Sequence, residues 1–233
     1  MINISDKAMS VNKEKYTSII EELANKATLV AVSKTKPAED IQALYDLGQK
    51  DFGENYVQEL IDKQSLLPTN IHWHFIGHLQ SNKVKYIAPF VYLIHGVDSF
   101  NLLQEINKQA AKNNRTIHCL LQIYIAREET KFGLDEKELN ELIDQLATQP
   151  FNNITIVGLM GMASFSEDKN LIKNEFNYLK RLFNKTNPAL SAINHPLSII
   201  SMGMSSDYKI AIEEGSTMVR IGSLLFGERN YSK

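Results

Sequence analysis

The stretch "TLVAVSKTKP", residues 28–37, opens the predicted core of the protein. Its small and β-branched residues are typical of a strand that is buried on both faces. The run nevertheless ends on Lys34, which is followed by a second lysine, Lys36, and by Pro37. Burying a charged amine is costly unless it has a partner or a task, which makes Lys34 a candidate functional residue.

Seven further apolar runs follow along the chain, separated by segments with apolar residues at helical spacing. The runs are residues 51–56, 71–77, 91–99, 117–125, 154–162, 197–204 and 217–227. The helical segments include Ile19, Ile20 and Leu23; Leu139, Leu142, Ile143 and Leu146; and Phe176, Leu179, Leu182 and Phe183. Buried strands that alternate with helices indicate parallel pairing, because crossover helices cover the sheet.

Eight such units within 233 residues favour a closed (β/α)₈ TIM barrel of the α/β class. An open Rossmann-type sheet is the alternative, but no G-x-G-x-x-G sequence follows the first strand. No Pro/Gly/Ser-rich linker marks a second domain. We therefore expect a single barrel domain over residues 1–233, with an extra N-terminal helix in residues 3–25.

The composition restricts the partners that the protein can have. A formal net charge of -2 argues against a nucleic-acid surface, which is usually basic. No apolar run approaches the ~20 residues that span a bilayer, and the polar N-terminus lacks the apolar core of a secretory signal. We expect a cytoplasmic protein without membrane or nucleic-acid partners, in which the single cysteine, Cys119, is a buried small hydrophobe.

The ends of the last two predicted strands are suited to an anion. "GMSSD" places Gly203, two serines and Asp207 at the start of a helix, where backbone N–H groups and the helix dipole favour negative charge. "RIGS" adds Gly222 and Ser223, and barrels frequently bind phosphate in this pair of loops. The alternative is that Ser205 or Ser206 is only a helix cap and Gly222 only a turn residue. Two such loops together predict a site for a phosphoryl group.

Strand alternation places Lys34 on the same face as Val30 and Val32. If this face points inward, the amine enters an enclosed mouth in which desolvation lowers its pKa and favours the neutral nucleophile. An amine beside a phosphate site suggests a Schiff base with pyridoxal 5'-phosphate (PLP). A lysine that merely extends its head into water is the alternative for Lys34, and Lys36 is the competing amine.

Arg220 precedes the phosphate-suited residues and is a candidate for contact with the cofactor ring. An arginine paired with a pyridine nitrogen donates its hydrogen bond, so the nitrogen must remain unprotonated. Such a ring is a weak electron sink. An ion pair between Arg220 and a nearby carboxylate is the alternative.

Several motifs, in this order along the chain, resemble one known family. They are "AVSKTKP", "FGENYVQE", "WHFIGHLQSNK", "GLMGM", "GMSSDY" and "GSTMVRIGSLLFGER". Together they resemble the pyridoxal-phosphate homeostasis protein family of the YggS/PROSC type. The resemblance implies the barrel of the alanine racemase N-terminal domain, PLP held on a lysine, and a role in PLP (vitamin B6) homeostasis without established turnover.

Matched motif by motif, the resemblance implies a set of cofactor-binding residues and neither a catalytic residue nor a metal ligand. The set consists of Lys34, Asn55, His74, Ser205, Arg220, Gly222 and Ser223. His74 is expected at the barrel mouth, with a structural histidine as the alternative. Lys36 and Lys131 are candidates for handling a second PLP, although a solvated surface amine is the favoured role.

Three functional classes are open at this point. The favoured one is a non-catalytic carrier that passes PLP to apo-enzymes, and the second is a PLP-dependent amino-acid racemase. Racemisation needs proton exchange on both faces of the substrate carbon, and alanine racemases take their second base from an additional C-terminal β-domain. This chain ends at "GERNYSK", so we expect no such base and a monomer. A signalling module that binds a partner through its surface is the third class.

Overall fold

Eight parallel strands close into a barrel in the computed structural model of the chain, which describes residues 11–126 and 132–227. The strands are β1 Thr28–Val32, β2 Asp51–Glu54, β3 His72–Phe75, β4 Leu93–Val97, β5 Ile117–Ile123, β6 Ile154–Gly161, β7 Ile199–Met204 and β8 Met218–Ile221. Each strand pairs with the next in sequence, and β1 closes the ring against β8 with Val30 opposite Arg220. The predicted TIM barrel is confirmed, and each of the eight predicted runs contains one strand.

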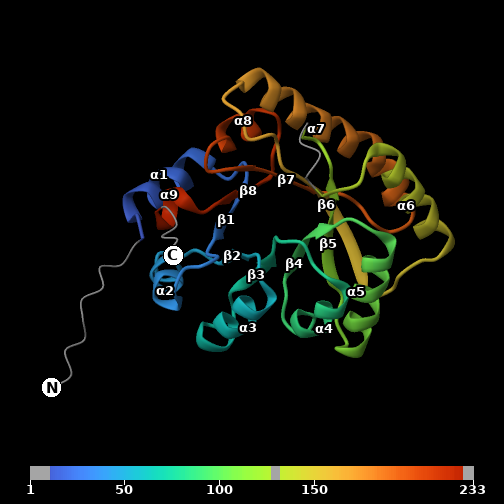
Figure 1. The fold of residues 1–233 in the computed structure, drawn as a ribbon, viewed down its shortest axis with the longest axis horizontal. Coiled ribbons are helices and arrows are strands. Elements are labelled where there is room, and N and C mark those ends of the chain that lie inside the picture. The colour runs from blue at the N-terminus through green and yellow to red at the C-terminus, as the bar shows by residue number, and fades with distance from the viewer. Residues whose placement is uncertain (1–10, 127–131, 228–233) are drawn as a thin grey trace.

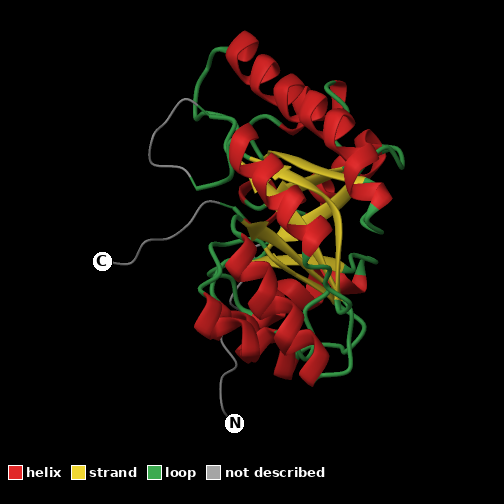
Figure 2. Cartoon of the chain, turned by 90° about the vertical axis from the view of Figure 1, so that its right-hand side faces the viewer, coloured by secondary structure: helices red, strands yellow, loops and turns green. Residues whose placement is uncertain are grey.

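Helices surround the strands (Figures 1 and 2). They are α1 Lys13–Leu23, α2 Ala38–Asp46, α3 Val57–Leu66, α4 Val84–Ile87, α5 Phe100–Lys112, α6 Glu136–Thr148, α7 Lys169–Ala192, α8 Tyr208–Glu213 and α9 Ser223–Phe226, with a 3₁₀ turn, η1, at Ser81–Lys83. α6 begins with a capping box between Asp135 and Glu138, which satisfies two backbone N–H groups.

The core has two parts. A small inner cluster fills the barrel and consists of Val30, Leu93, Leu120, Met160 and Met218. A larger layer lies between sheet and helices and includes the predicted apolar stripes of α6 and α7. Cys119 is fully buried in this layer, and burial raises the pKa of its thiol.

Two boundaries differ from the sequence prediction. β1 ends at Val32, so Lys34 is not the last residue of the strand but lies in the turn that follows it. The strand stops because the chain turns there: the Lys36 N–H donates to the Ser33 carbonyl at 3.0 Å. The N-terminal helix begins at Lys13, where the Asn12 side chain caps it, and the predicted residues 3–10 lie outside the described residues.

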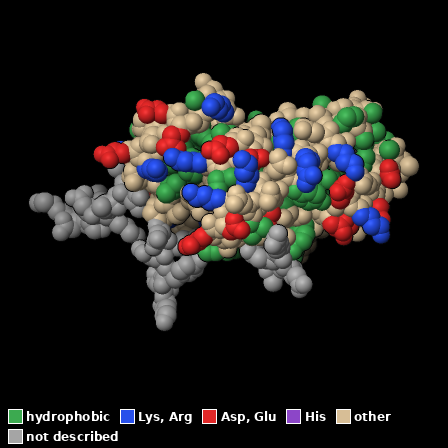
Figure 3. Space-filling view, turned by 90° about the horizontal axis from the view of Figure 1, so that it is seen from above, with side chains coloured by type: hydrophobic (Ala, Val, Ile, Leu, Met, Phe, Trp, Pro, Cys, Tyr) green, Lys and Arg blue, Asp and Glu red, His purple; other side chains and the backbone are tan. Residues whose placement is uncertain are grey.

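The N-terminal helix lies beside the last helix of the barrel. The Asn12 N–H donates to the Leu225 carbonyl at 2.8 Å, and Figure 1 shows α1 next to α9. Seen from the α7 side, Lys and Arg side chains are interspersed with Asp and Glu (Figure 3), so this face carries no single-sign patch. Within residues 11–126 and 132–227, no helix is both long and apolar enough to cross a membrane.

Candidate cofactor site

A cavity of about 510 Å³ opens at the carboxyl ends of the strands and is lined by residues from several strand ends. Six of the seven predicted cofactor residues line it: Lys34, Asn55, Ser205, Arg220, Gly222 and Ser223. Lys36 lines it as well. In this barrel, as in others, the ends of distant strands converge on one mouth.

Lys34 reaches this cavity because the inward face of β1 continues into the turn. Val30 belongs to the inner cluster, and Val32 and Lys34 line the cavity above it. Lys34 is therefore on the inward face of the chain, as predicted, and it is half-buried. The Lys36 amine instead donates to the Phe226 carbonyl at 2.6 Å, at the edge of the same cavity.

The loops after β7 and β8 are joined by a direct contact. The Gly222 N–H donates to the Ser205 Oγ at 3.3 Å, and Ser223 follows as the first residue of α9. A Cβ on Gly222 would lie 3.1 Å from the Val32 carbonyl, so glycine permits this approach of β8 to β1. Gly203 has φ +96° and its Cβ would clash with α8, so it allows the Ser205 turn to form tightly. Two hydroxyl-bearing residues from neighbouring loops, Ser205 and Ser223, thus line the same cavity.

Arg220 is buried on β8, and its guanidinium is hydrogen-bonded to residues of other barrel strands. Its Nη1 donates to the Ser201 carbonyl at 2.8 Å and to the Ser201 Oγ at 2.7 Å, and its Nη2 donates to the Gly161 carbonyl at 3.1 Å. Burial lowers the pKa of Arg220 to about 10, although Asp207 opposes the shift, so the guanidinium is charged at neutral pH. These three acceptors are two carbonyls and a hydroxyl rather than a carboxylate, and Asp207 acts on Arg220 through its charge.

His74 does not lie at the barrel mouth. It is fully buried inside the barrel, where its Nε2 lies 3.0 Å from the Asp51 Oδ1 and its Nδ1 lies 2.9 Å from the His95 Nε2. Its side chain is absent from the lining of the cavity. The expectation that His74 lies at the barrel mouth is therefore wrong, and the alternative of a structural histidine fits, with a carboxylate and an imidazole as its partners.

These groups form one buried chain of hydrogen bonds that ends on Arg220. The His95 Nδ1 lies 3.1 Å from the Ser201 Oγ, which accepts from Arg220. Because the Asp51 carboxylate only accepts, the His74 Nε2 donates to it, the His95 Nε2 donates to His74, and Ser201 donates to His95. Burial lowers the pKa of both histidines, so each is neutral and the donors all point from Arg220 toward Asp51.

A second cluster lies under the turn that carries Lys34 and was not predicted from the sequence. The Lys63 Nζ donates to the Glu54 Oε1 at 2.7 Å and to the Glu59 Oε1 at 2.6 Å. Burial raises the pKa of Glu54 to about 7, while Lys63 and Ser33 act in the opposite direction. The motif "FGENYVQE" contains both acids, but its pattern alone does not show that they share a lysine.

Asn55 contributes an unsatisfied polar atom at the cavity. Its Oδ1 is buried and has no hydrogen-bond partner among the described residues. Buried polar atoms are nearly always paired in native proteins, so this oxygen fits a site that a ligand completes. Lys131, the remaining predicted amine, lies outside the described residues.

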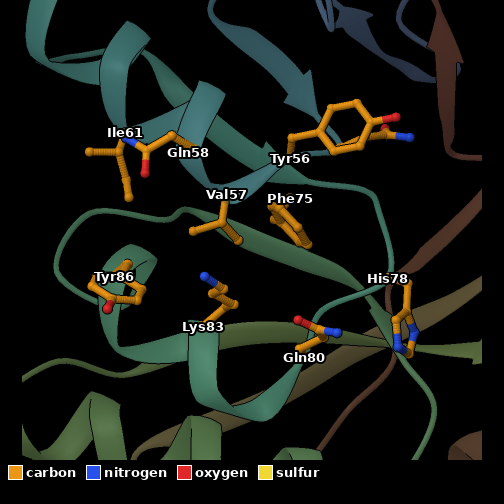
Figure 4. A pocket seen from close by; sticks show the side chains of 10 residues that line it. Tyr56, Val57, Gln58, Ile61, Phe75, His78, Gln80, Lys83 and Tyr86 are labelled. Atoms are coloured by element: carbon orange, nitrogen blue, oxygen red, sulfur yellow. The ribbon is translucent and has the colours of Figure 1, made fainter.

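Asn55 also lines a second cavity of about 500 Å³ between α3 and α4. Figure 4 shows the Lys83 amine pointing between Val57 and Tyr86 in this cavity, and its Nζ lies 5.7 Å from the centre of the Tyr86 ring. The two cavities have nearly the same volume, so volume does not distinguish them. Only the first combines an amine with the β7 and β8 loops and a buried arginine.

The sequence and the fold are similar to those of known proteins. Residues 9–230 match the family model described as alanine racemase, N-terminal domain. A pyridoxal phosphate homeostasis protein from Aquifex aeolicus is 43% identical over 208 residues, which cover 89% of each chain. The chain belongs to the pyridoxal phosphate homeostasis protein family. A human relative of that description is 40% identical over 88% of this chain and 78% of its own.

Solved structures agree with membership of the homeostasis family. PipY of Synechococcus elongatus, solved with PLP bound, is 33% identical with a TM-score of 0.83, over 92% of this chain and 99% of PipY. Alanine racemase of Clostridium difficile is 15% identical with a TM-score of 0.70, over 95% of this chain and 59% of the racemase. The second likeness shows a shared barrel only.

Proposed function

We propose that this protein binds PLP through a Schiff base on Lys34 and holds it for PLP homeostasis without catalytic turnover. The observation that carries the proposal is the convergence of Lys34, the Ser205 and Ser223 loops and Arg220 on one cavity. Family membership supports the same conclusion, because relatives are described as pyridoxal phosphate homeostasis proteins and PipY was solved with PLP bound.

The residues of the cavity fit PLP. The cofactor carries a phosphate, a phenolic oxygen, an aldehyde and a pyridine nitrogen, which require donors, an amine and a partner for the ring. The hydroxyls of Ser205 and Ser223 suit the phosphate, and Asn55 offers its amide to a polar ring substituent. Arg220 has five N–H donors, of which its contacts with Ser201 and Gly161 use three.

PLP supplies an electrophilic aldehyde and an electron-withdrawing ring. The Lys34 amine would hold PLP at its aldehyde by a condensation that releases water and needs neither an oxidant nor a reductant. Arg220 is charged and can only donate, so a pyridine nitrogen beside it accepts and stays unprotonated. This arrangement favours retention of the cofactor over carbanion chemistry.

A racemase is the second candidate, because Lys36 provides another amine at the same cavity. Among the described residues that line the cavity, the titratable side chains are Lys34, Lys36 and Arg220. Racemisation at useful rates needs a base on each face of the substrate carbon. Lys36 is therefore the residue on which this alternative depends, and its amine is bonded to the Phe226 carbonyl.

Apo-enzymes that use PLP are the proposed recipients, because their own active-site lysines can displace Lys34 from the C=N bond. A monomeric, cytoplasmic protein remains a prediction of the sequence.

The first prediction is that the PLP-loaded protein is yellow and that borohydride fixes the cofactor on Lys34. Borohydride reduces the C=N bond to a stable secondary amine, which peptide mapping locates. Lys34→Ala should abolish the adduct on residue 34, while Lys83→Ala, which changes an amine in a cavity of similar size, should leave it intact. An adduct on Lys36 or Lys83 in the unmutated protein would refute the assignment of Lys34.

A further inference from the structure

The turn that carries Lys34 rests on a buried ammonium group. Lys63, on α3, keeps only 8% of its side chain exposed and donates from its Nζ to three acceptors. They are the Ser33 carbonyl at 2.7 Å, the Glu54 Oε1 at 2.7 Å and the Glu59 Oε1 at 2.6 Å. One cation thus joins the β1 turn, the end of β2 and the first turns of α3.

Both chain neighbours of Lys34 are bound to this cluster. The Ser33 hydroxyl donates to the Glu54 Oε1 at 2.6 Å, and the Ser33 carbonyl accepts from Lys63. On the other side, the Thr35 N–H donates to the Glu59 carboxylate. The side chains of Lys63, Glu54 and Glu59 therefore fix the backbone immediately before and after Lys34.

The backbone at this point needs such support. Thr35 has φ +65°, a left-handed conformation that is unfavourable for a β-branched residue. Conformations of this kind persist only where the surroundings impose them, and they concentrate at functional sites. The Thr35 N–H points to Glu59 in this conformation, so a change in its φ would break that hydrogen bond.

From these contacts we infer that Lys63, Glu54 and Glu59 are positioning residues that aim the Lys34 amine at the cofactor and set its advantage over Lys36. The inference rests on the proposed function, because it assigns these residues to the binding of PLP. Charged hydrogen bonds suit this task, since they are shorter and stronger than neutral ones and hold a fixed direction. Lys36, which lies beyond the turn, is bonded to α9 instead.

Glu59→Ala is the variant that tests the inference. It removes the acceptor of Thr35 but leaves Lys63 with Glu54 and the Ser33 carbonyl, so we expect the fold to survive. The matched control is Glu141→Ala, which removes a glutamate from an exposed helical pair with Lys137 on α6. Glu59→Gln keeps an acceptor oxygen for the Thr35 N–H, so it should behave much more like the unmutated protein than Glu59→Ala does.

Two readouts separate positioning from mere stability. In the cofactor-free protein, Glu59→Ala should raise the hydrogen-exchange rate of the Thr35 amide, which the control should not change. After PLP is added, the Schiff base should form on Lys34 roughly tenfold more slowly, and the borohydride adduct should shift in part to Lys36. The melting temperature should stay close to that of the control.

The outcomes are distinguishable from those of the proposed function. If the unmutated protein and Glu141→Ala form no adduct on Lys34, the proposed function fails. If both form it and Glu59→Ala matches them in rate and in the share of adduct on Lys36, the positioning role is overturned while PLP binding stands.

Discussion

At the scale of single residues, Glu54 is a carboxyl group whose charge is costly to bury. Its Oε1 accepts from Ser33 and Lys63, while its buried Oε2 has no partner within the part of the chain that the structure describes. Burial accordingly raises the pKa of Glu54 to about 7 in the folded protein. In the unfolded chain the carboxyl is solvated and titrates near its ordinary pKa of about 4.3. The folded state therefore binds this proton more tightly than the unfolded state.

The sign of the resulting pH dependence follows from linkage. Below the unfolded pKa the contribution of Glu54 to stability is fully present, and it is lost as the pH rises to about 7. We expect Glu54→Gln to remove this dependence, so the difference in unfolding free energy between the two proteins changes by on the order of 1–3 kcal/mol from pH 5 to pH 8. Urea unfolding of both proteins at pH 5 and pH 8 measures this change, with Glu141→Gln, at an exposed position, as the control. A difference that is constant with pH would contradict the prediction.

At the scale of elements, the loops after β7 and β8 act as a pair. Ser205 accepts from the Gly222 N–H, so each loop positions the other before any ligand is present. Ser205 is half-buried and Ser223 is exposed, and neither belongs to the apolar core. Their replacement should consequently affect ligand binding more than folding.

We predict that Ser205→Ala and Ser223→Ala each weaken PLP binding by about 1.5–3 kcal/mol, since each loses a hydrogen bond to a charged acceptor. This corresponds to roughly a ten- to hundredfold increase in Kd. Titration of the cofactor-free protein with PLP, followed by absorbance, gives the Kd, and thermal melts check the fold. Ser191→Ala, on the surface of α7, is the control. Unchanged Kd values in both variants would place the phosphate elsewhere.

The strands and helices were predictable because their signal is local. Each of the eight apolar runs became a strand, and Leu139, Leu142, Ile143 and Leu146 face the core from α6. The strand ends were less predictable, as β1 shows: the turn at Lys34 is fixed by contacts with β2 and α3 rather than by its own residues.

The candidate site was predictable where a single motif shows both that a residue lies at a strand end and that its side chain suits the cofactor. Lys34, Ser205 and Arg220 line the cavity as expected, whereas His74 does not. Its depth in the barrel depends on partners 21 and 23 residues away, His95 and Asp51, which no local pattern reveals. The Lys63 cluster was missed for the same reason.

At the scale of the whole molecule, two polar systems support the cavity from below and from the side. The chain from Asp51 through the two histidines and Ser201 ends on Arg220, while the Lys63 cluster holds the turn of Lys34. Both systems are largely buried and directional, so they restrict how Arg220 and the turn of Lys34 can move. Neither adds a group to the cavity that could exchange a proton with a substrate carbon. The architecture is therefore suited to holding a cofactor.

The last prediction is that the PLP-loaded protein shows no sustained exchange at the Cα of amino acids. An incoming amino acid can displace Lys34 from the C=N bond, which frees the Lys34 amine on one face of the substrate carbon. In the proposed function Arg220, which is charged and can only donate, would leave the ring a poor electron sink. The amine that would have to act on the other face, Lys36, is hydrogen-bonded to the Phe226 carbonyl. Incubation with a panel of L-amino acids in deuterated water, followed by NMR and chiral analysis, tests this, with Lys36→Ala as the paired variant. Deuteration or D-enantiomer formation at about 1 s⁻¹ or faster that is lost in Lys36→Ala would establish the racemase instead.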